Sequence, residues 1–303
     1  MTSSAWVKKI KKNYVLYLFI LPAFLYVLIF HYFPLYGIQI AFKDFSGIKG
    51  IWGSEWVGLK HFKEFIFSPM FGTLIKNTLV LSIYSLIAGF PIPIILALLL
   101  NSSKNKKLRS VVQTLTYAPY FISTVVFCGM LLLFLSPTTG IINKMIVSLG
   151  GESVNFMQEE ALFPSIYVWS GIWQTTGWSS IIYLSALSGI SPSLHEAAVV
   201  DGATRLQRIR YIDFPGIIPT AVVIFLLNMG NLMSVGFEKV YLLQNSMNIT
   251  SSEIISTYVY KMGILNAQYS FSTAVSLFNN LINILLLLSA NRLAKRYFGT
   301  SLW

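Results

Sequence analysis

The chain contains six long stretches that lack aspartate, glutamate, lysine and arginine. They cover residues 13–42, 77–103, 111–143, 161–194, 214–237 and 262–291. Each stretch can supply the roughly 20 apolar residues that cross about 30 Å of hydrocarbon as a helix. Because the backbone must satisfy its own hydrogen bonds in lipid, uninterrupted stretches of this length favour helices. The sequence therefore predicts an all-α integral membrane protein with six transmembrane helices.

Composition agrees with a membrane protein and excludes other classes. Of the 303 residues, 55% are hydrophobic and 11% are charged, whereas soluble domains carry about 25% charged residues. The single cysteine, Cys128, excludes a disulfide framework. We expect a cytoplasmic basic tail over residues 1–12, followed by a single transmembrane domain over residues 13–303.

The positive charges predict how the chain is oriented. If the N-terminus is cytoplasmic, 14 of the 22 lysines and arginines fall in cytoplasmic segments, together with three acidic residues. The outer segments hold the other eight basic residues and eight acidic residues, so the net charge of +11 lies entirely on the cytoplasmic side. Because cytoplasmic loops are enriched in lysine and arginine, we expect both termini to be cytoplasmic. The excess charge therefore indicates topology and not a nucleic-acid surface.

One polar segment, HEAAVVDGATRLQRIRYIDFP at residues 195–215, interrupts the apolar second half of the chain. The spacing of Ser193 and Glu196 predicts a capping box, so a helix should begin near Ser193. Gly202 permits a turn that other residues make only at a cost. A second helix is expected over residues 205–210, with Pro215 ending it and beginning the next span. The segment should form a helix–bend–helix elbow in the cytoplasm. The alternative is a plain hairpin whose arginines contact lipid phosphates.

The elbow resembles the EAA motif of ABC importer permeases, which has the form E-A-A-x-x-D-G-A followed by I-x-L-P and a later proline. The matching residues are Glu196, Ala197, Ala198, Asp201, Gly202, Ala203, Ile212, Pro215 and Pro219. Phe214 stands where the family usually has leucine and Ile209 where it often has phenylalanine, and both keep an apolar side chain. Two stretches nearer the N-terminus, LFILPAFLYVLIFHYFPLYGIQIAF and WVGLKHFKEF, resemble carbohydrate-type permeases. Within that type, the chain looks most like the subgroup that carries complex oligosaccharides.

This resemblance implies a type I ABC importer permease fold in a bacterial cell membrane. It implies a pore shared with a second, homologous permease subunit. Two ATP-binding subunits would dock on the cytoplasmic side, and a sugar-binding protein would dock on the extracellular or periplasmic side. The loop over residues 191–215 would couple this chain to the ATPase through Glu196, Ala197, Ala198, Asp201, Gly202, Ala203 and Pro215. No cofactor is expected in this chain, because ATP and Mg²⁺ would bind to the partner subunits.

Polar and aromatic side chains inside the uncharged stretches predict a path for a sugar. Amides suit sugar hydroxyls, and indoles suit the apolar faces of sugar rings. The candidate substrate-path residues are Trp173, Gln174, Trp178, Asn228, Asn231 and Ser234. The family resemblance places the sugar site near four of them, Gln174, Trp178, Asn231 and Ser234. The alternative is that these side chains make interhelical hydrogen bonds and interfacial anchors. For Asn279, Asn280 and Asn283, packing against the sister permease is at least as well supported.

The sequence also lacks the motifs of several other functions. It has no Gly-Lys pair and therefore no P-loop, so transport energy must come from another subunit. No catalytic set or metal-binding motif involves the three histidines, and no carboxylate lies inside a stretch to relay protons. The predicted function is that of a non-enzymatic permease subunit of an oligosaccharide importer. A peptide or polyamine importer is the first alternative, and it is disfavoured because no charged residue is expected in the cavity. A membrane transferase is the second, and it is disfavoured because the cytoplasmic acidic residues all lie in the elbow.

Overall fold

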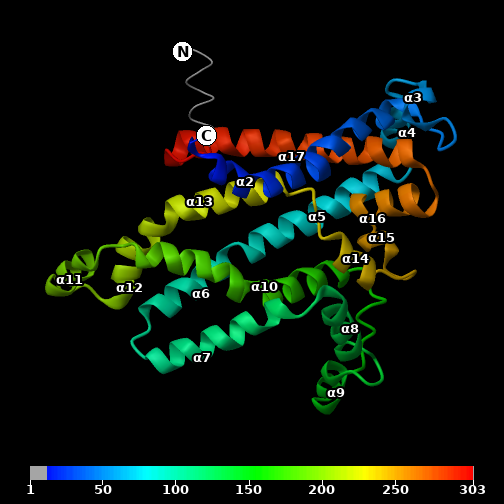
Figure 1. The fold of residues 1–303 in the computed structure, drawn as a ribbon. Helices are drawn as coiled ribbons and strands as arrows, with labels where there is room; N and C mark the ends of the chain where they lie inside the picture. The colour runs from blue at the N-terminus through cyan, green and yellow to red at the C-terminus, as the bar shows by residue number, and fades with distance from the viewer. Residues whose placement is uncertain (1–11, 303) are drawn as a thin grey trace.

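The computed structural model describes residues 12–302 and is mostly helical, as predicted. Its long helices run side by side in one bundle (Figure 1). These are α5 (Phe71–Gly89), α6 (Pro91–Ser102), α7 (Lys106–Tyr117), α10 (Phe163–Ser188), α13 (Phe214–Gly230) and α17 (Tyr269–Phe298). The elbow, with α11 (Pro192–Val200) and α12 (Arg205–Arg208), lies at one end of the bundle, and small elements gather at the other end.

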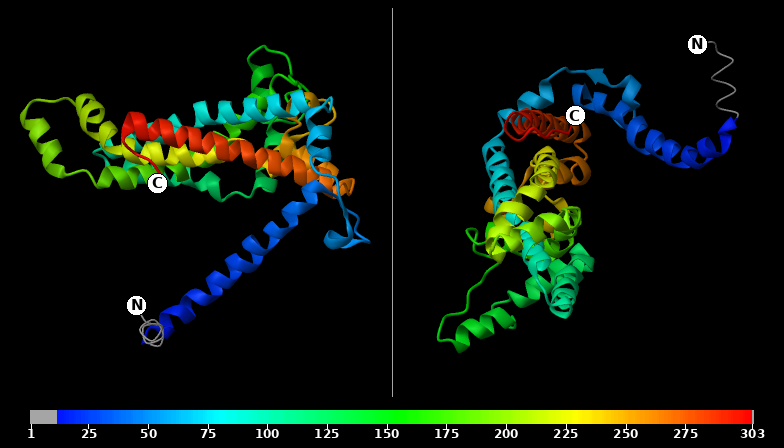
Figure 2. Two further views of the ribbon diagram at one scale, coloured as in Figure 1. Left: turned by 90° about the horizontal axis from the view of Figure 1, so that it is seen from above. Right: turned by 90° about the vertical axis from the view of Figure 1, so that its left-hand side faces the viewer.

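The first uncharged stretch forms a helix that leaves the bundle. It consists of α2 (Tyr14–Val27), the π-helix η1 (Leu28–Tyr32) and the 3₁₀-helix η2 (Phe33–Phe42). Only η2 packs against α17, whereas α2 has no buried residue. Figure 2 shows the α2 segment pointing away from the other helices in both views. Its apolar surface is therefore left to lipid or to another chain.

The second stretch forms one candidate span, Phe71–Ser102, in which α5 and α6 meet at Phe90. The third stretch differs from the prediction of one long helix. It is broken into α7, the 3₁₀-helix η3 (Ala118–Phe121) and α8 (Thr124–Phe134), and the two halves are bent by 102°. Pro119 lies in the break, and the Ser123 side chain caps α8 by accepting a hydrogen bond from Val126 N. A proline followed by a capping serine ends one helix and begins another.

The fourth stretch forms the 26-residue helix α10, which is long enough to cross a bilayer at about 1.5 Å per residue. It is not among the helices that are apolar enough to be candidate spans. Within residues 12–302 there are four such helices, or five if the bent pair is one span. Serine, threonine, glutamine and tryptophan residues lower the hydropathy of α10. Helix α10 can carry these polar side chains because it lies at the centre of the bundle, where it packs against α5, α6, α7 and α13.

The fifth and sixth stretches form spans whose ends are shifted from their predicted positions. Helix α12, the π-helix η4 (Ile209–Asp213) and α13 form one continuous candidate span, Arg205–Gly230. Helix α17 begins at Tyr269 and continues through Lys295 and Arg296 to Phe298. Basic residues in the last turn of a helix are favoured by the helix dipole. The first basic residue therefore ends the apolar stretch, but the helix continues beyond it.

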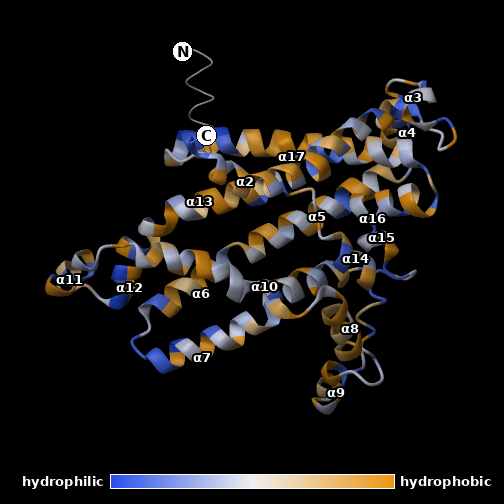
Figure 3. Ribbon diagram, in the orientation of Figure 1, coloured by the Kyte–Doolittle hydropathy of each residue, from blue (hydrophilic) through white to orange (hydrophobic). Residues whose placement is uncertain are grey.

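Small elements build the end of the bundle opposite the elbow. A two-residue antiparallel pair, β1 (Lys43–Asp44) and β2 (Glu55–Trp56), precedes α4 (Lys60–Ile66). The remaining elements are α3 (Gly50–Gly53), α9 (Ile141–Ser148), α14 (Phe237–Leu243), α15 (Ile249–Ser252), α16 (Ile255–Tyr260) and the π-helix η5 (Lys261–Leu265). Figure 3 shows hydrophilic residues concentrated on α12, the start of α7 and the C-terminal end of α17, all at the elbow end.

Candidate functional site

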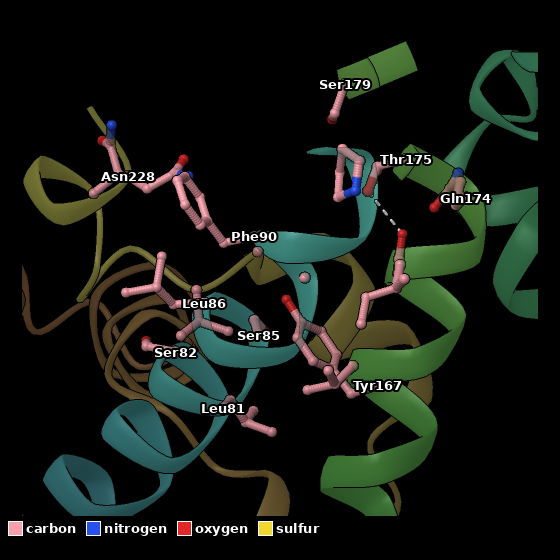
Figure 4. A pocket seen from close by; sticks show the side chains of 18 of the residues that line it. Leu81, Ser82, Ser85, Leu86, Phe90, Tyr167, Gln174, Thr175, Ser179 and Asn228 are labelled. Atoms are coloured by element: carbon pink, nitrogen blue, oxygen red, sulfur yellow. Dashed lines mark hydrogen bonds between the residues drawn. The ribbon is translucent and has the colours of Figure 1, made fainter. Parts of the chain in front are cut away.

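A cavity of about 690 Å³ opens between α5, α6, α10, α13 and the segment that leads into α14. Figure 4 shows Ser82 and Ser85 of α5 on one side with Asn228 of α13 above them, and Gln174 and Thr175 of α10 on the other side. Hydroxyls and amides alternate with apolar side chains along the wall. Such a lining suits a solute that has both hydroxyl groups and apolar faces.

Helix α10 places an aromatic platform and an amide on this wall. The Trp178 ring stacks on Tyr120, with ring centroids 4.6 Å apart and planes 4° from parallel. The Gln174 side chain donates a hydrogen bond of 3.0 Å to Ile122 O. Both Tyr120 and Ile122 belong to the break between α7 and α8. The broken span is therefore what positions these two cavity residues.

The segment after α13 carries the next predicted residues, and helix α17 holds it in place. Asn283 Oδ1 accepts a hydrogen bond of 2.8 Å from Met233 N, and its Nδ2 donates one of 3.0 Å to Ser234 Oγ. Asn279 Nδ2 adds a bond of 3.2 Å to Met233 O. The Asn231 side chain donates to Leu227 O. Asn279 and Asn283 thus bond within the chain and position the 231–236 segment.

The structure brings five of the six predicted substrate-path residues to one cavity. These are Gln174, Trp178, Asn228, Asn231 and Ser234. Trp173 is not among the lining residues, and its ring stacks on Phe127 at a centroid distance of 5.9 Å. Helical periodicity separates it, because Trp173 is about 140° around α10 from Trp178 at 3.6 residues per turn.

Among the lining residues that sequence reasoning missed, Lys239 is the charged one, and the expectation of a cavity without charged side chains is wrong. Lys239 was counted with the outer charges because it follows the uncharged stretch by two residues. Instead, α14 folds back on the bundle, and Lys239 is only 9% exposed. Its neighbours Val240 and Leu243 are buried as well. A lysine within the short apolar helix FEKVYLL was the sequence signal.

The ammonium of Lys239 rests among aromatic rings and one carbonyl. Its Nζ donates a hydrogen bond of 2.8 Å to Tyr167 O. It lies 4.8 Å from the Tyr167 ring centroid and 5.2 Å from that of Phe127. Burial lowers the pKa of Lys239 to about 8, so the group is still mostly protonated at pH 7.

The elbow has the predicted bend at Gly202. This residue has a φ of +77°, a left-handed conformation that glycine adopts at least cost, so the prediction is confirmed. Ala203 N donates a hydrogen bond of 2.8 Å to Ala198 O and closes the end of α11. Thr204 then starts α12 through a capping box with Gln207. The turn is therefore specified on both sides.

The start of the elbow differs from the prediction. Helix α11 begins at Pro192, and its N-cap is Ser191, so Ser193 is not a cap. Proline is favoured at the first helical position because it has no N–H to leave unpaired. Glu196 is exposed and makes no side-chain hydrogen bond within residues 12–302. The predicted capping box is wrong, and the Glu196 carboxylate is left facing solvent.

The end of the elbow also differs, because Pro215 does not end a helix. The chain continues as a helix from Arg205 to Gly230, with η4 just before Pro215. A π-helical turn changes the hydrogen-bonding register locally, which accommodates a residue that lacks an N–H donor. The second half of the elbow is therefore continuous with α13.

One buried carboxylate ties the elbow to the bundle. Asp213 is 3% exposed, and its Oδ1 lies 3.2 Å from His195 Nε2. Asn101, at the end of α6, donates a hydrogen bond of 3.4 Å to the same oxygen. Three separate elements thus meet at Asp213. By contrast, α11 itself buries no residue, and Val200 is 87% exposed.

Comparison with known families and proteins gives consistent matches. Residues 89–299 match the family described as binding-protein-dependent transport system inner membrane component. Protein LplB of Bacillus subtilis strain 168 is 42% identical over 293 residues, covering 97% of this chain and 92% of that protein. The polygalacturonan/rhamnogalacturonan transport system permease protein YteP of the same organism is 45% identical over 291 residues, covering 96% of this chain and 90% of its own length.

The fold matches a solved transporter over nearly its whole length. A chain in the crystal structure of a bacterial ABC transporter, involved in the import of the acidic polysaccharide alginate, superimposes with a TM-score of 0.90. It is 40% identical, and the match covers 97% of this chain and 99% of that one. The same values hold for the alginate transporter in complex with its alginate pentasaccharide-bound periplasmic protein.

Proposed function

Since the chain belongs to the family of binding-protein-dependent transport system inner membrane components, we propose that it is the permease subunit of an ATP-driven oligosaccharide importer. The observation that carries the proposal is the cavity, where an indole platform and several amides and hydroxyls converge among the long helices. The stacked Trp178 suits the apolar face of a sugar ring. Gln174, Asn228, Asn231 and Ser234 suit its hydroxyls. We assign these five residues to the substrate path, with Trp173 outside it.

The elbow is the part of the chain that couples to an ATPase. Its small residues Ala197 and Ala198 and the bend at Gly202 form a thin ridge on which Ala197 and Gly202 are exposed and Ala198 is half-buried. Glu196 and Asp201 add carboxylates that are free to pair with a partner. Ala203 and Pro215 connect the ridge to α13. This arrangement supports docking of an ATP-binding subunit, where ATP and Mg²⁺ would be held.

The proposed assembly contains two permease subunits, two ATP-binding subunits and an external sugar-binding protein. The exposed apolar surface of α2 supports a place beside a second membrane chain. The alginate transporter in complex with a periplasmic protein is a precedent for the external partner.

The proposed topology has six spans and two cytoplasmic ends. It counts α10 and the bent α7–α8 pair together with the four apolar helices. Support comes from the charge pattern, since the basic starts of α7 and α12 and the basic end of α17 share one end of the bundle.

Reconstitution tests the proposal. The chain is co-expressed with the permease, ATP-binding and binding-protein genes that neighbour it, and the complex is placed in proteoliposomes. We expect ATP hydrolysis to rise when the binding protein is loaded with an oligosaccharide, and the sugar to accumulate inside. ATP hydrolysis that responds to peptide or polyamine and to no carbohydrate would contradict it. An enzymatic product formed from the sugar would favour a transferase instead.

A further inference from the structure

We propose that the cargo is an acidic oligosaccharide, and that Lys239 binds a uronate carboxylate as the sugar crosses the cavity. This inference rests on the proposed function. It adds that the cargo is negatively charged and that Lys239 recognises this charge. It concerns the side chain that sequence reasoning left out of the cavity.

Lys239 is a buried cation without an anionic partner. None of the ion pairs among residues 12–302 includes it, and the protein supplies one hydrogen-bond acceptor, Tyr167 O, for its three N–H donors. Removing a charge from water is costly unless an opposite charge or hydrogen bonds replace the water. The aromatic rings of Tyr167 and Phe127 compensate only in part. A site that keeps such a cation is suited to an anion that arrives from outside the chain.

The ammonium is accessible from the cavity, which carries a net positive charge. Among the described residues that line the cavity, Lys239 is the only charged one. Gly171 faces it, and a Cβ at that position would lie 3.2 Å from Nζ. Glycine therefore lets the ammonium lie close against α10. A cavity with a single cation attracts carboxylates and repels polyamines.

The groups around Lys239 suit the remainder of an acidic sugar. The Ser82 hydroxyl is buried at the wall and has no hydrogen-bond partner in the described structure. Ser234 and Asn231 lie on the segment that leads to α14. An acidic oligosaccharide offers a carboxylate for the ammonium, hydroxyls for these groups and, on another ring, an apolar face for Trp178. The buried ammonium and the unpaired Ser82 hydroxyl would thereby each gain a partner.

The comparisons support the same class of cargo. The solved transporter with 40% identity is described as importing an acidic polysaccharide, and the relative with 45% identity is described by polygalacturonan, a polymer of uronates. A purely structural role for Lys239, as the link between α14 and Tyr167 O, is the competing explanation.

The test is uptake by the complete transporter, with its binding protein, in proteoliposomes. The probes are alginate pentasaccharide, pentagalacturonate and the carboxyl-reduced, neutral counterpart of each. Binding of every probe to the isolated binding protein is measured by calorimetry, so that delivery and translocation are separated. We expect the wild type to import an acidic probe. Lys239→Met should lower the acidic-to-neutral uptake ratio at least tenfold, and Lys239→Arg should keep it within about threefold. Lys144→Met removes an exposed lysine on α9 and should change nothing.

A second measurement needs no variant. The titratable groups that face Lys239 are the Cys128 thiol on α8 and the Tyr167 phenol on α10, and Glu238 is its neighbour on α14. Because burial lowers the pKa of Lys239 to about 8, the ammonium loses its proton as the pH rises through that value. The acidic-to-neutral ratio should fall between pH 7 and pH 10, and it should not fall in Lys239→Arg.

The outcomes distinguish this inference from the proposed function. If no carbohydrate is imported or stimulates ATP hydrolysis, the proposed function fails. If the wild type imports neutral oligosaccharides and rejects both acidic probes, only the present inference fails. An unchanged ratio in Lys239→Met together with a flat pH profile means that the lysine is structural. If Lys239→Met does not assemble, the pH dependence of the acidic-to-neutral uptake ratio in the wild type and in Lys239→Arg decides between a binding role and a structural role for the lysine.

Discussion

Two tryptophans on α10, five residues apart, differ in what they contact, and under the proposed function only the one that lines the cavity can meet a sugar. Trp178 lines the cavity and stacks on Tyr120, whereas Trp173 stacks on Phe127 away from the cavity wall. Both rings are about half exposed in the isolated chain, at 44% and 55%. Exposure alone therefore does not separate them, but position does.

Trp178→Ala should lower oligosaccharide uptake at limiting substrate by about tenfold, which corresponds to about 1.4 kcal/mol. The lost platform includes both the indole and its stacking on Tyr120, so Trp178→Phe should recover part of the activity. Trp173→Ala is the matched control and should transport nearly normally. Equal losses for the two alanine variants would mean that the indoles serve packing. The measurement is initial uptake in proteoliposomes with equal amounts of assembled complex.

For single residues, the sequence predicted which side-chain types could contact a sugar but not which of them line the same cavity. The types of residue that could meet a sugar were apparent, because tryptophan and amides are unusual in a membrane helix. Which of them share a wall depends on the rotation of α10 and on the fold of the 231–236 segment. Lys239 shows this most clearly. Its charge predicts a position in an outer, solvent-exposed segment, whereas α14 folds back on the bundle and buries the side chain. Tertiary packing, and not local propensity, decided its environment.

Among the helices, local sequence determines the bend of the elbow, but it does not predict how the elbow connects to α13. Gly202 with a φ of +77° and the Thr204 cap set the bend, and the sequence predicted the first of these. The continuous helix through η4 into α13 was not predicted, because a proline in sequence favours a helix boundary. The π-helical turn before Pro215 removes that boundary. Asn228 in the cavity thus lies on the same continuous helix as α12, Arg205–Gly230.

Gly202→Val should uncouple transport from ATP hydrolysis. A β-branched residue in the left-handed conformation costs about 1–3 kcal/mol, and no atom crowds the position, so the backbone and not a clash would change. Ala198→Trp should act differently, by adding bulk to the exposed ridge. We expect the ATP-binding subunits to dissociate from Ala198→Trp, and substrate-stimulated hydrolysis to be lost in both variants.

The control for these variants is Val200→Ala, which trims a side chain that is 87% exposed and leaves the bend intact. Co-purification of the ATP-binding subunits and substrate-stimulated hydrolysis are measured together. Full retention of both in Ala198→Trp would show that the ATPase docks elsewhere on the chain.

Asn283 links two elements, and its loss should affect the cavity without touching the sugar. Its side chain holds Met233 N and Ser234 Oγ, so Asn283→Leu frees the 231–236 segment and leaves a buried N–H unpaired, at a cost of about 1–3 kcal/mol. We expect weaker uptake and a lower thermal midpoint of the purified complex. Asn280→Leu, on the exposed side of α17, should leave both nearly unchanged. A normal midpoint in Asn283→Leu would contradict the positioning role.

In the whole molecule, the bundle end that carries the elbow is the end with the excess of basic over acidic residues. The starts of α7 and α12 and the last turn of α17 meet there. The sequence predicted this charge asymmetry but not the number of helices that pass an apolarity test. The discrepancy has a physical cause, because α10 is polar where it lines the cavity and the α7–α8 pair is bent where it braces Trp178 and Gln174. A transporter must place polar groups inside its spans, and hydropathy alone undercounts them.

The same asymmetry predicts that both ends of the chain lie in the cytoplasm. A reporter that is active only in the cytoplasm, fused after Trp303, should be active, and one fused within the 245–248 turn before α15 should be inactive. A reporter that is active only outside should give the reverse pattern. If α10 did not cross, the chain would have five spans, and the elbow and the C-terminus would both lie on the side opposite the N-terminus, because the two spans α13 and α17 separate them. The reporter at the C-terminus therefore also reports the side on which the elbow lies. An outside signal at the C-terminus would therefore overturn the six-span topology and, with it, the docking of an ATPase on the elbow.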